Sequence, residues 1–456
     1  MAARCRYRLP QPHASATRDR ITEMAFLQPR AGTAPAAPPL TGGQVRTLAL
    51  TSLGGALELF DFVIFVYFVP TLAQVFFPPA LPGWLAELQT FTVFAVGYFA
   101  RPVGGVLVAH FGDRIGRKRT FNFTLTLMAL ATLAMGFLPT YTDWGLAAPL
   151  LLSLLRLVQG IAVGGEVSGG YLFGAEHVAD ARRGSAMGFI ACGMTFGVLL
   201  GVLVAMLIHM MVPEADILGF GWRIAFAIGG GLGLACVFLR KSLDETPVFR
   251  ALKAEDRLAR DLPIRTVMRH HGRGVVVSVL AFWPFIAHFA VLSLMGPTLL
   301  QTLYHTPPVT ALFAGCLATA GLIMAAPISG LMFDRLGQAH ALALVAPLAF
   351  MCDLACFLLA PGHPDLRVPL MGLAGFGGGL FGAASVIMIR SFPPPVAYSG
   401  VSLSLNLVSG IIAGVTPMVI SAALPVLPSA PLWYLAAACA AASGLARWLR
   451  GRVSAG

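Results

Sequence analysis

Long stretches of apolar side chains recur along almost the whole chain, and they constrain its fold more than any other feature. Each stretch is about as long as the roughly 20 residues that a helix needs to cross a bilayer. The twelve stretches lie at 46–76, 88–111, 120–139, 146–175, 185–212, 222–240, 274–303, 309–333, 339–360, 367–391, 399–424 and 430–449. They are continuous, whereas the strands of a membrane β-barrel alternate polar and apolar residues. The pattern therefore predicts an all-α membrane protein with twelve transmembrane helices.

The composition agrees with lipid as the main solvent of these helices. Hydrophobic residues make up 57% of the 456 positions and charged residues only 11%, whereas soluble domains carry about 25% charged residues. The net charge of +11 does not indicate a nucleic-acid partner, because most Lys and Arg residues lie in the tails and in the short gaps between the apolar stretches, where cytoplasmic loops collect positive charge. Most cysteines lie inside the stretches without the spacing of metal ligands. We therefore expect neither a metal nor a bound cofactor.

The basic residues predict the orientation of the chain in the membrane. Lys and Arg crowd the gaps after the second and fourth stretches, the central segment and the chain end. They are absent from 77–87, 140–145, 304–308 and 425–429. Cytoplasmic loops are the ones that collect positive charge. The alternation therefore predicts a multi-pass protein of the cytoplasmic (inner) membrane with both termini in the cytoplasm.

A short polar motif repeats at about half the chain length, which predicts two parallel halves of six helices. The sequence from Gly112 to Arg119 follows the second stretch, and Asp334 and Arg335 follow the eighth. The aspartates of the two copies are 334 − 113 = 221 residues apart. The predicted division is a disordered cytoplasmic tail at 1–45, a six-helix bundle at 46–240, a cytoplasmic loop at 241–273, a second six-helix bundle at 274–450 and a cytoplasmic tail at 451–456.

Several polar side chains fall inside the apolar stretches, where an ionisable group costs about 2.5–3.5 kcal/mol on insertion scales. The predicted substrate- and proton-binding residues are Glu58, Asp61, Arg101, Arg156, Gln159, Glu166, His288 and Asn406. Glu58 and Asp61 share one helical face, and two partly desolvated carboxyl groups are suited to binding a proton outside and releasing it inside. Arg101 or Arg156 is expected to hold a substrate carboxylate through paired hydrogen bonds.

A plainer interpretation stays open for these residues. The charged side chains would then only neutralise one another and fix the packing of the helices. His288 and Asp353 would be structural residues, and Gln159 and Asn406 would hydrogen-bond between helices instead of lining a cavity.

The same residues resemble the signatures of a known family. The loop Asp113-Arg-x-Gly-Arg-Lys118 is similar to the signature of the major facilitator superfamily. Glu58-Leu-Phe-Asp61-Phe62 and the stretch from Arg156 to Glu166 resemble the metabolite:proton symporter family, which includes carriers of citrate, alpha-ketoglutarate, shikimate, and proline or betaine. The chain departs from that family where Arg390 replaces a glutamate and Ala397 an arginine.

The loop motifs predict a gate at the cytoplasmic ends of the helices. Its predicted residues are Asp113, Arg114, Gly116, Arg117, Asp334, Arg335 and Arg390. We expect Arg390 to pair with Asp334 and so to replace the contacts that are usual in the family. A role of these charges in setting the topology alone is the plainer alternative.

The resemblance implies the major facilitator fold and proton-coupled uptake of a small organic carboxylate or zwitterion by alternating access. The partners would be the solute, protons and membrane lipid, and a monomer is compatible with this interpretation. No enzymatic activity is expected, because no catalytic group is predicted to face either aqueous side. An efflux antiporter of the same fold and a non-transporting sensor stay open as alternatives.

Overall fold

The computed structural model describes residues 40–115, 117–164, 166–240, 263–393 and 396–454, and these residues form helices and the turns between them. The predicted all-α class is confirmed. Nine of the described helical segments are both long enough and apolar enough to cross a membrane. Large apolar side chains such as Phe123, Met324 and Leu344 are exposed on the outer faces of helices, as expected where the surrounding solvent is lipid.

Six long helical segments make up the first half of the chain. They consist of α2 (Gly42–Val63) with η1 (Val66–Phe68) and α3 (Val69–Phe76), α4 (Gly83–Ile115), α5 (Arg117–Gly136), α7 (Ala147–Val163) with α8 (Glu166–Glu176), α9 (Arg183–Met211), and η3 (Ile217–Gly221) with α11 (Trp222–Arg240). Short elements join them: α6 (Tyr141–Trp144), η2 (Asp180–Arg182) and α10 (Glu214–Asp216).

Six further segments make up the second half. They consist of α14 (Gly272–His288) with η4 (Phe289–Leu294) and α15 (Gly296–Tyr304), α16 (Pro308–Leu336), α17 (Gln338–Leu359), α18 (Arg367–Gly379) with η6 (Gly382–Ala384) and α19 (Ser385–Arg390), α20 (Ala397–Leu407) with η8 (Val408–Ala413) and α21 (Gly414–Ala423), and α22 (Ala430–Ser454). The helix α13 (Pro263–His270) precedes them, and η5 (Pro364–Leu366) lies between α17 and α18.

The structure refines the predicted boundaries. The first helix begins at Gly42, inside the predicted tail, because Thr41 and Gln44 form a capping box there. Part of the predicted central loop is helical, since α13 occupies its end. The predicted tail over residues 1–39 and most of the loop, 241–262, lie outside the described residues.

Several helices that the sequence predicts as continuous are interrupted within the apolar stretch. The fourth segment is divided at Gly164, and the seventh changes to a π-helix at Phe289. The first, tenth and eleventh segments contain short 3-10 or π turns in the same way. Turns of this kind release backbone hydrogen bonds, and in a membrane they are tolerated where protein or a cavity covers them.

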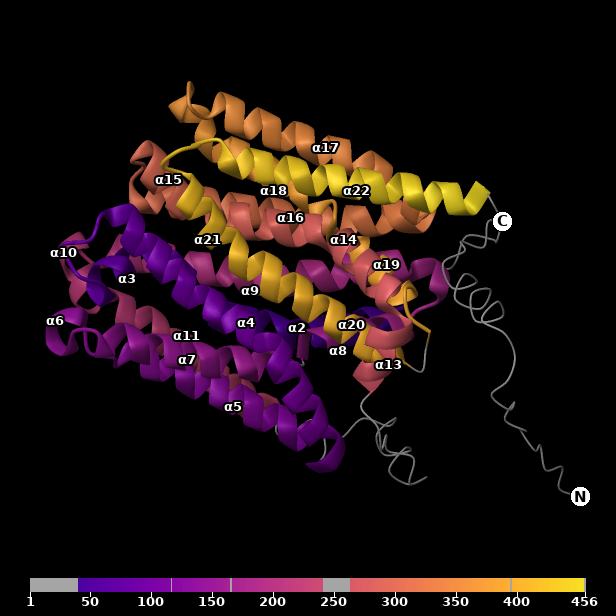
Figure 1. Ribbon diagram of the computed structural model, residues 1–456, viewed down its shortest axis with the longest axis horizontal. Helices are drawn as coiled ribbons and strands as arrows, with labels where there is room; N and C mark the ends of the chain where they lie inside the picture. The colour runs from indigo at the N-terminus through magenta and orange to yellow at the C-terminus, as the bar shows by residue number, and fades with distance from the viewer. Residues whose placement is uncertain (1–39, 116, 165, 241–262, 394–395, 455–456) are drawn as a thin grey trace, which may run out of the picture.

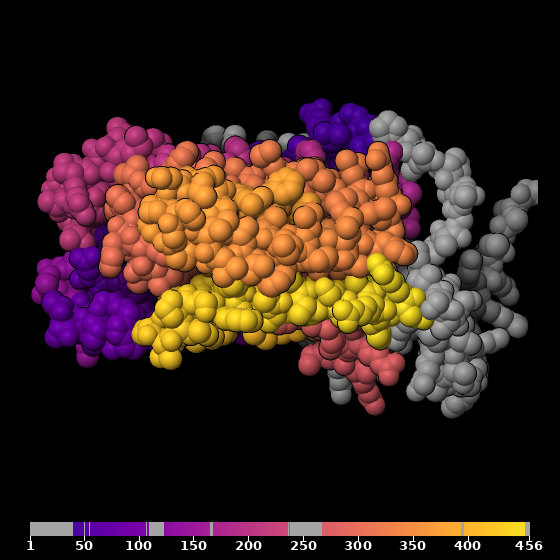
Figure 2. Space-filling view, turned by 90° about the horizontal axis from the view of Figure 1, so that it is seen from above, coloured from indigo at the N-terminus to yellow at the C-terminus, as the bar shows by residue number. Residues whose placement is uncertain are grey.

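The two halves of the chain lie against each other along the long axis of the molecule. Figure 1 shows the first-half helices, indigo to magenta, on one side, and the second-half helices, orange to yellow, on the other. Seen from above, the second half covers much of the molecule, with α22 lying lengthwise along it (Figure 2). The halves meet where α9 packs on α16, α8 on α20 and α4 on α21.

We call the end of the molecule at which α2 begins and α22 ends the terminal end, and the opposite end, which carries α6 and α10, the distal end (Figure 1). Close packing between helices fixes the positions of the residues that lie between these two ends. A Cβ on Gly197 of α9 would lie 1.8 Å from the carbonyl oxygen of Ala56 on α2. Glycine is therefore required at this crossing, which holds α2 and its acidic residues against the rest of the bundle.

Candidate functional site

Two acidic side chains of α2 are buried in the first half of the molecule. Glu58 and Asp61 are each 1% exposed. Asp61 points toward α11, where a Cβ on Gly229 would lie 3.2 Å from its Oδ1 atom. Neither carboxylate oxygen of Asp61 accepts a hydrogen bond from a described residue. A carboxyl group in this position is costly as an anion, because buried charges need a partner.

Arg156 of α7 is completely buried beside Asp61, but it does not form an ion pair with it among the described contacts. Its Nη1 atom donates to the carbonyl oxygen of Phe62 at 3.1 Å, and also to Gln159 Oε1. Its guanidinium group lies 4.2 to 4.8 Å from the ring centres of Phe62, Phe65 and Phe94. Aromatic faces attract a desolvated cation, so this setting holds the charge without neutralising it.

Gln159 connects three helices around Asp61. Its Nε2 atom donates to Thr132 Oγ1 of α5 at 2.6 Å and, at 3.4 Å, to the backbone carbonyl oxygen of Asp61 on α2. Its Oε1 atom accepts from Arg156. Of the two roles predicted for Gln159, the structure shows hydrogen bonding between helices.

Arg101 belongs to a different place, a cavity between the two halves. The cavity has a volume of about 50 Å³ and is lined by Leu59, Tyr98, Arg101, Val167, Tyr171, Ala191, Met194, Thr195, Phe282, Ile286, Phe289, Leu405, Ser409 and Ala413. Arg101 is the one charged side chain among these described lining residues. Its guanidinium carbon lies 5.5 Å from the ring centre of Tyr98, and its Nε atom makes no hydrogen bond with a described residue.

Aromatic rings from both halves meet across this central cavity. Tyr171 of α8 and Phe282 of α14 make an edge-to-face contact with ring centres 5.9 Å apart. Phe289, the first residue of the π-helix η4, lines the same space. The cavity thus combines one arginine with several aromatic faces, and the interrupted helices supply much of its wall.

Asn406 joins the two halves beside the central cavity. Its Nδ2 atom donates to the carbonyl oxygen of Gly164 at 2.8 Å, at the division between α7 and α8. The sequence left open whether Asn406 lines a cavity or bonds between helices, and the structure shows the bond. The side chain of Glu166 lies outside the described residues.

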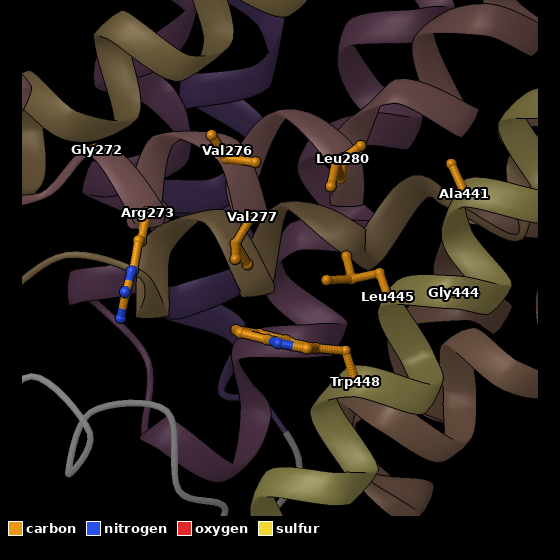
Figure 3. A pocket seen from close by; sticks show the side chains of 9 residues that line it. All are labelled: Gly272, Arg273, Val276, Val277, Leu280, Ala441, Gly444, Leu445 and Trp448. Carbon is orange, nitrogen blue, oxygen red and sulfur yellow. The ribbon is translucent and has the colours of Figure 1, made fainter.

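A larger hollow lies on the outer face of the second half, between α14 and α22. Its volume is about 820 Å³, and its wall is apolar except for Arg273. Figure 3 shows Arg273 at one end and Trp448 across from the helix α14. This hollow shares no lining residue with the central cavity, so it is separate from the cavity that contains Arg101.

The predicted pairing of Asp334 with Arg390 is wrong. Asp334, near the end of α16, accepts hydrogen bonds from the backbone nitrogens of Gly184 and Ser185 at 2.7 and 2.9 Å, and from Ser185 Oγ at 2.5 Å. These nitrogens belong to the first turn of α9, whose free N–H groups and positive dipole end favour an anion. The helix end, and not an arginine, is therefore the partner of Asp334.

Arg390 contacts another acid at the terminal end. Its Nη2 atom lies 3.1 Å from Asp180 Oδ2 and donates to the Asp180 carbonyl oxygen at 3.0 Å. Arg335 is exposed. The side chains of Asp113, Arg114 and Arg117, together with Gly116, lie outside the described part of the chain.

One contact between the halves at the distal end was not predicted. Thr302 Oγ1 of α15 donates to Glu87 Oε2 of α4 at 3.2 Å. The halves are therefore joined by polar contacts at both ends, with the small central cavity between them. Nothing in the sequence around Glu87 distinguishes it from an ordinary residue at a helix end.

Comparison with known proteins places this architecture. The model of the Major Facilitator Superfamily matches residues 51–417, which is most of the chain. This chain belongs to the major facilitator superfamily. Its structure is similar to that of the proton:xylose symporter XylE bound to 6-bromo-6-deoxy-D-glucose, with a TM-score of 0.70 over 91% of this chain and 97% of that one, at 18% identity. The fold predicted from the sequence is confirmed.

Curated relatives within the superfamily confirm the predicted metabolite:proton symporter group. The glycine betaine/proline/ectoine/pipecolic acid transporter OusA of Dickeya dadantii is 30% identical over 392 residues, 82% of this chain and 76% of that protein. The inner membrane metabolite transport protein YhjE of Escherichia coli is also 30% identical, over 82% of this chain and 86% of its own. The proline/betaine transporter of Salmonella typhimurium is 30% identical, over 82% and 76%.

This superfamily member has one further buried polar group, which the sequence did not predict as a unit. His288 of α14 and Asp353 of α17 lie 2.9 Å apart, and neither side chain is exposed. The sequence identified both residues but not their contact. The repeat offered a signal, because Asp353 stands at the same distance from Thr132, 353 − 132 = 221 residues, as Asp334 from Asp113.

Proposed function

We propose that this transporter takes up a small zwitterion of the proline or betaine kind together with a proton. The observation that carries the proposal is the position of Arg101, a lone cation among aromatic rings in the cavity between the halves. A guanidinium group binds a carboxylate through paired hydrogen bonds. Aromatic faces attract the ammonium group of the same solute. The names of OusA and the Salmonella protein include solutes with both groups.

The size of the cavity fits an occluded state of the transport cycle. Its volume of about 50 Å³ is far below the roughly 300–1,000 Å³ of a usual small-molecule site. Polar contacts join the halves at both ends, through Asp334 at the terminal end and Glu87 at the distal end. Opening of either contact would widen the cavity toward one side, which is what alternating access requires.

Asp61 is the residue that we assign to proton coupling. Its carboxylate lies buried beside Arg156 but accepts no hydrogen bond from it, so the group is suited to exist with a proton bound. Gln159 holds the backbone of Asp61 and contacts Arg156 at the same time. A change in the charge of Asp61 would therefore affect the contacts that join helices α2, α5 and α7.

The orientation proposed for the molecule follows from its loops. The terminal end carries Arg182, Arg183 and the arginines of α13, whereas the described distal loops are poor in basic residues. We therefore place the terminal end in the cytoplasm. By analogy with YhjE, an inner membrane protein by name, we assign the chain to the cytoplasmic membrane.

An uptake screen in proteoliposomes tests the function. We expect proline or betaine to accumulate under an inward proton gradient, and citrate, alpha-ketoglutarate and shikimate to accumulate much less, since a single arginine serves the cavity. A protonophore should abolish the accumulation. Preferred uptake of citrate would contradict the proposed solute class, and accumulation that survives the protonophore would contradict proton coupling.

A further inference from the structure

The pair formed by His288 and Asp353 lies apart from the proposed transport site. The two side chains are completely buried inside the second half, and neither lines the central cavity. Cys439 of α22 lies beside them, with its Sγ atom within 4.8 Å of a ring nitrogen of His288 and a carboxylate oxygen of Asp353. The ring of Phe381 lies 5.6 Å from the imidazole. Cys352 and Cys356, on α17 with Asp353, are further titratable residues close to the pair.

The hydrogen bonds indicate that His288 and Asp353 share one proton between them, in addition to the hydrogen on His288 Nδ1. His288 Nδ1 lies 2.7 Å from the carbonyl oxygen of Pro284, and because a carbonyl only accepts, Nδ1 carries a hydrogen. His288 Nε2 lies 2.9 Å from Asp353 Oδ2. That second contact also needs a hydrogen, supplied either by an imidazolium or by a carboxylic acid. Loss of this proton would leave two acceptors facing each other and an uncompensated buried anion.

The pair occupies a position in the second half that corresponds to the position of Asp61 in the first half. Asp61 lies on the first helix of its half beside Thr132 on the third helix, and α11, the sixth, faces it. His288, Asp353 and Cys439 lie on the first, third and sixth helices of the other half. Both halves thus bury a titratable group behind their first helix.

His288 also lies where its helix changes form. The α-helix α14 ends at His288, and the π-helix η4 begins at Phe289, which lines the central cavity. Beyond η4, α15 carries Thr302, whose hydroxyl joins the halves at the distal end. Single π turns occur frequently at functional sites in helices. A change at His288 is therefore placed to reach both the cavity and the distal contact.

We propose that the His288–Asp353 pair is a second proton-binding site, and that its proton holds the α14–η4–α15 segment in the closed position at the distal end. This inference rests on the proposed transport function. Release of the proton would break the contact between α14 and α17 and free α15 to move away from Glu87. His288 and Asp353 act here as positioning residues, since neither touches the cavity.

The substitution Asp353→Asn separates a titrating pair from a structural one. The asparagine Nδ2 group donates to a neutral His288 at the point where the carboxylic acid would, so the variant imitates the proton-loaded pair and cannot release that proton. We expect it to fold with a thermal stability close to that of the wild type. The double variant His288→Gln with Asp353→Asn is likewise uncharged and gives a second test.

Solute counterflow in proteoliposomes at equal pH on both sides gives the readout, measured from pH 5.5 to 9. In Asp61→Asn, which lacks the first proton site, we expect the rate still to change with pH, by about tenfold per pH unit where the second proton is lost. Adding Asp353→Asn should flatten this profile. Cys439→Ala, which removes a neighbour but keeps both members of the pair, should leave the slope of the profile unchanged.

Two results would overturn the inference. One is a flat profile already in Asp61→Asn, and the other is an unchanged profile when Asp353→Asn is added. A loss of thermal stability with the pH profile preserved would identify the pair as structural and so count against the proposal. Failure of the transport function itself would look different, since the wild type would then show no counterflow with any of the candidate solutes.

Discussion

Two buried arginines of similar appearance in the sequence have different surroundings in the molecule. Arg156 is enclosed by three phenylalanine rings and hydrogen-bonded to Phe62 and Gln159. Arg101 reaches the cavity between the halves, and its Nε atom is unused by the described residues. We therefore assign solute binding to Arg101, whereas the contacts of Arg156 belong to the surroundings of Asp61.

Substitution of Arg101 tests this division of roles. We expect Arg101→Gln to raise the KM for solute by about 10- to 100-fold, because hydrogen bonds to charged groups contribute about 1.5–3 kcal/mol. Arg101→Lys keeps the charge but loses the paired geometry, so its KM should lie between that of the wild type and that of Arg101→Gln. Uptake kinetics in proteoliposomes measure the effect, and an unchanged KM in Arg101→Gln would show that the solute binds elsewhere.

At the scale of helices, the ends of elements do much of the work of holding the halves together. Asp334 at the end of α16 binds the first turn of α9, and a Cβ on Gly184 would come within 2.5 Å of its Oδ1 atom. Arg390 at the end of α19 contacts Asp180 in η2. Both contacts join the two halves at the terminal end, which is the position that a gate there requires.

Asp334→Asn is expected to weaken closure of the terminal end. The neutral amide loses the charge-assisted bonds to Gly184 and Ser185, and a loss of about 1.5–3 kcal/mol shifts the opening equilibrium about 10- to 100-fold. Labelling rates of a cysteine introduced in the central cavity, by a reagent added on the side of the terminal end, measure the opening. The exposed Arg335→Gln is the matched control. Equal labelling of both variants would contradict the assigned gate.

Charge reversal identifies the partner of Arg390. Arg390→Asp should reduce transport, and the double variant Asp180→Arg with Arg390→Asp should recover part of it, because the contact is restored with its signs exchanged. Asp180 also pairs with Arg183 at 2.6 Å, so recovery will be incomplete. Recovery by reversal of Asp334 in place of Asp180 would contradict the observed pairing.

The distal turn α6 gives a pH-dependent prediction. Asp143 accepts hydrogen bonds from Thr140 Oγ1 and the Thr140 nitrogen at 2.7 and 2.9 Å, and these bonds hold the pKa of Asp143 below its ordinary value of 3.8. The stabilisation of the turn is thus present above pH 4 and lost as the pH falls through the lowered pKa. Hydrogen exchange in α6 should be faster in Asp143→Asn than in the wild type at pH 7. A difference that persists at the lowest pH would contradict this account.

At the scale of the whole molecule, the sequence predicted the fold well and the contacts poorly. Twelve apolar stretches and a repeated Asp-Arg motif are enough to indicate twelve helices in two halves, because lipid leaves few alternatives. The burial of Glu58, Asp61, Arg101 and Arg156 followed from the same rule. The partner of Asp334 could not be predicted, because an arginine and the N-terminal end of a helix both attract a carboxylate, and the sequence does not say which of them lies next to it.

The missed contacts share a physical cause. The pair of His288 with Asp353 and the bond from Thr302 to Glu87 join helices that are distant in the sequence. Periodicity places a residue on a face of its own helix, but it does not say which face of another helix lies opposite. The interruptions at Gly164 and Phe289 were missed for a related reason, because cavity and neighbouring helices decide where a membrane helix tolerates a break.

Solute-driven proton entry tests most directly the central claim, that solute crosses through the central cavity together with a proton bound by Asp61. When betaine or proline is added to proteoliposomes in weakly buffered medium, we predict that the medium becomes more alkaline as protons enter with the solute. Asp61→Asn should abolish this alkalinisation and still exchange solute by counterflow. Solute entry without alkalinisation in the wild type, or full alkalinisation in Asp61→Asn, would contradict the account.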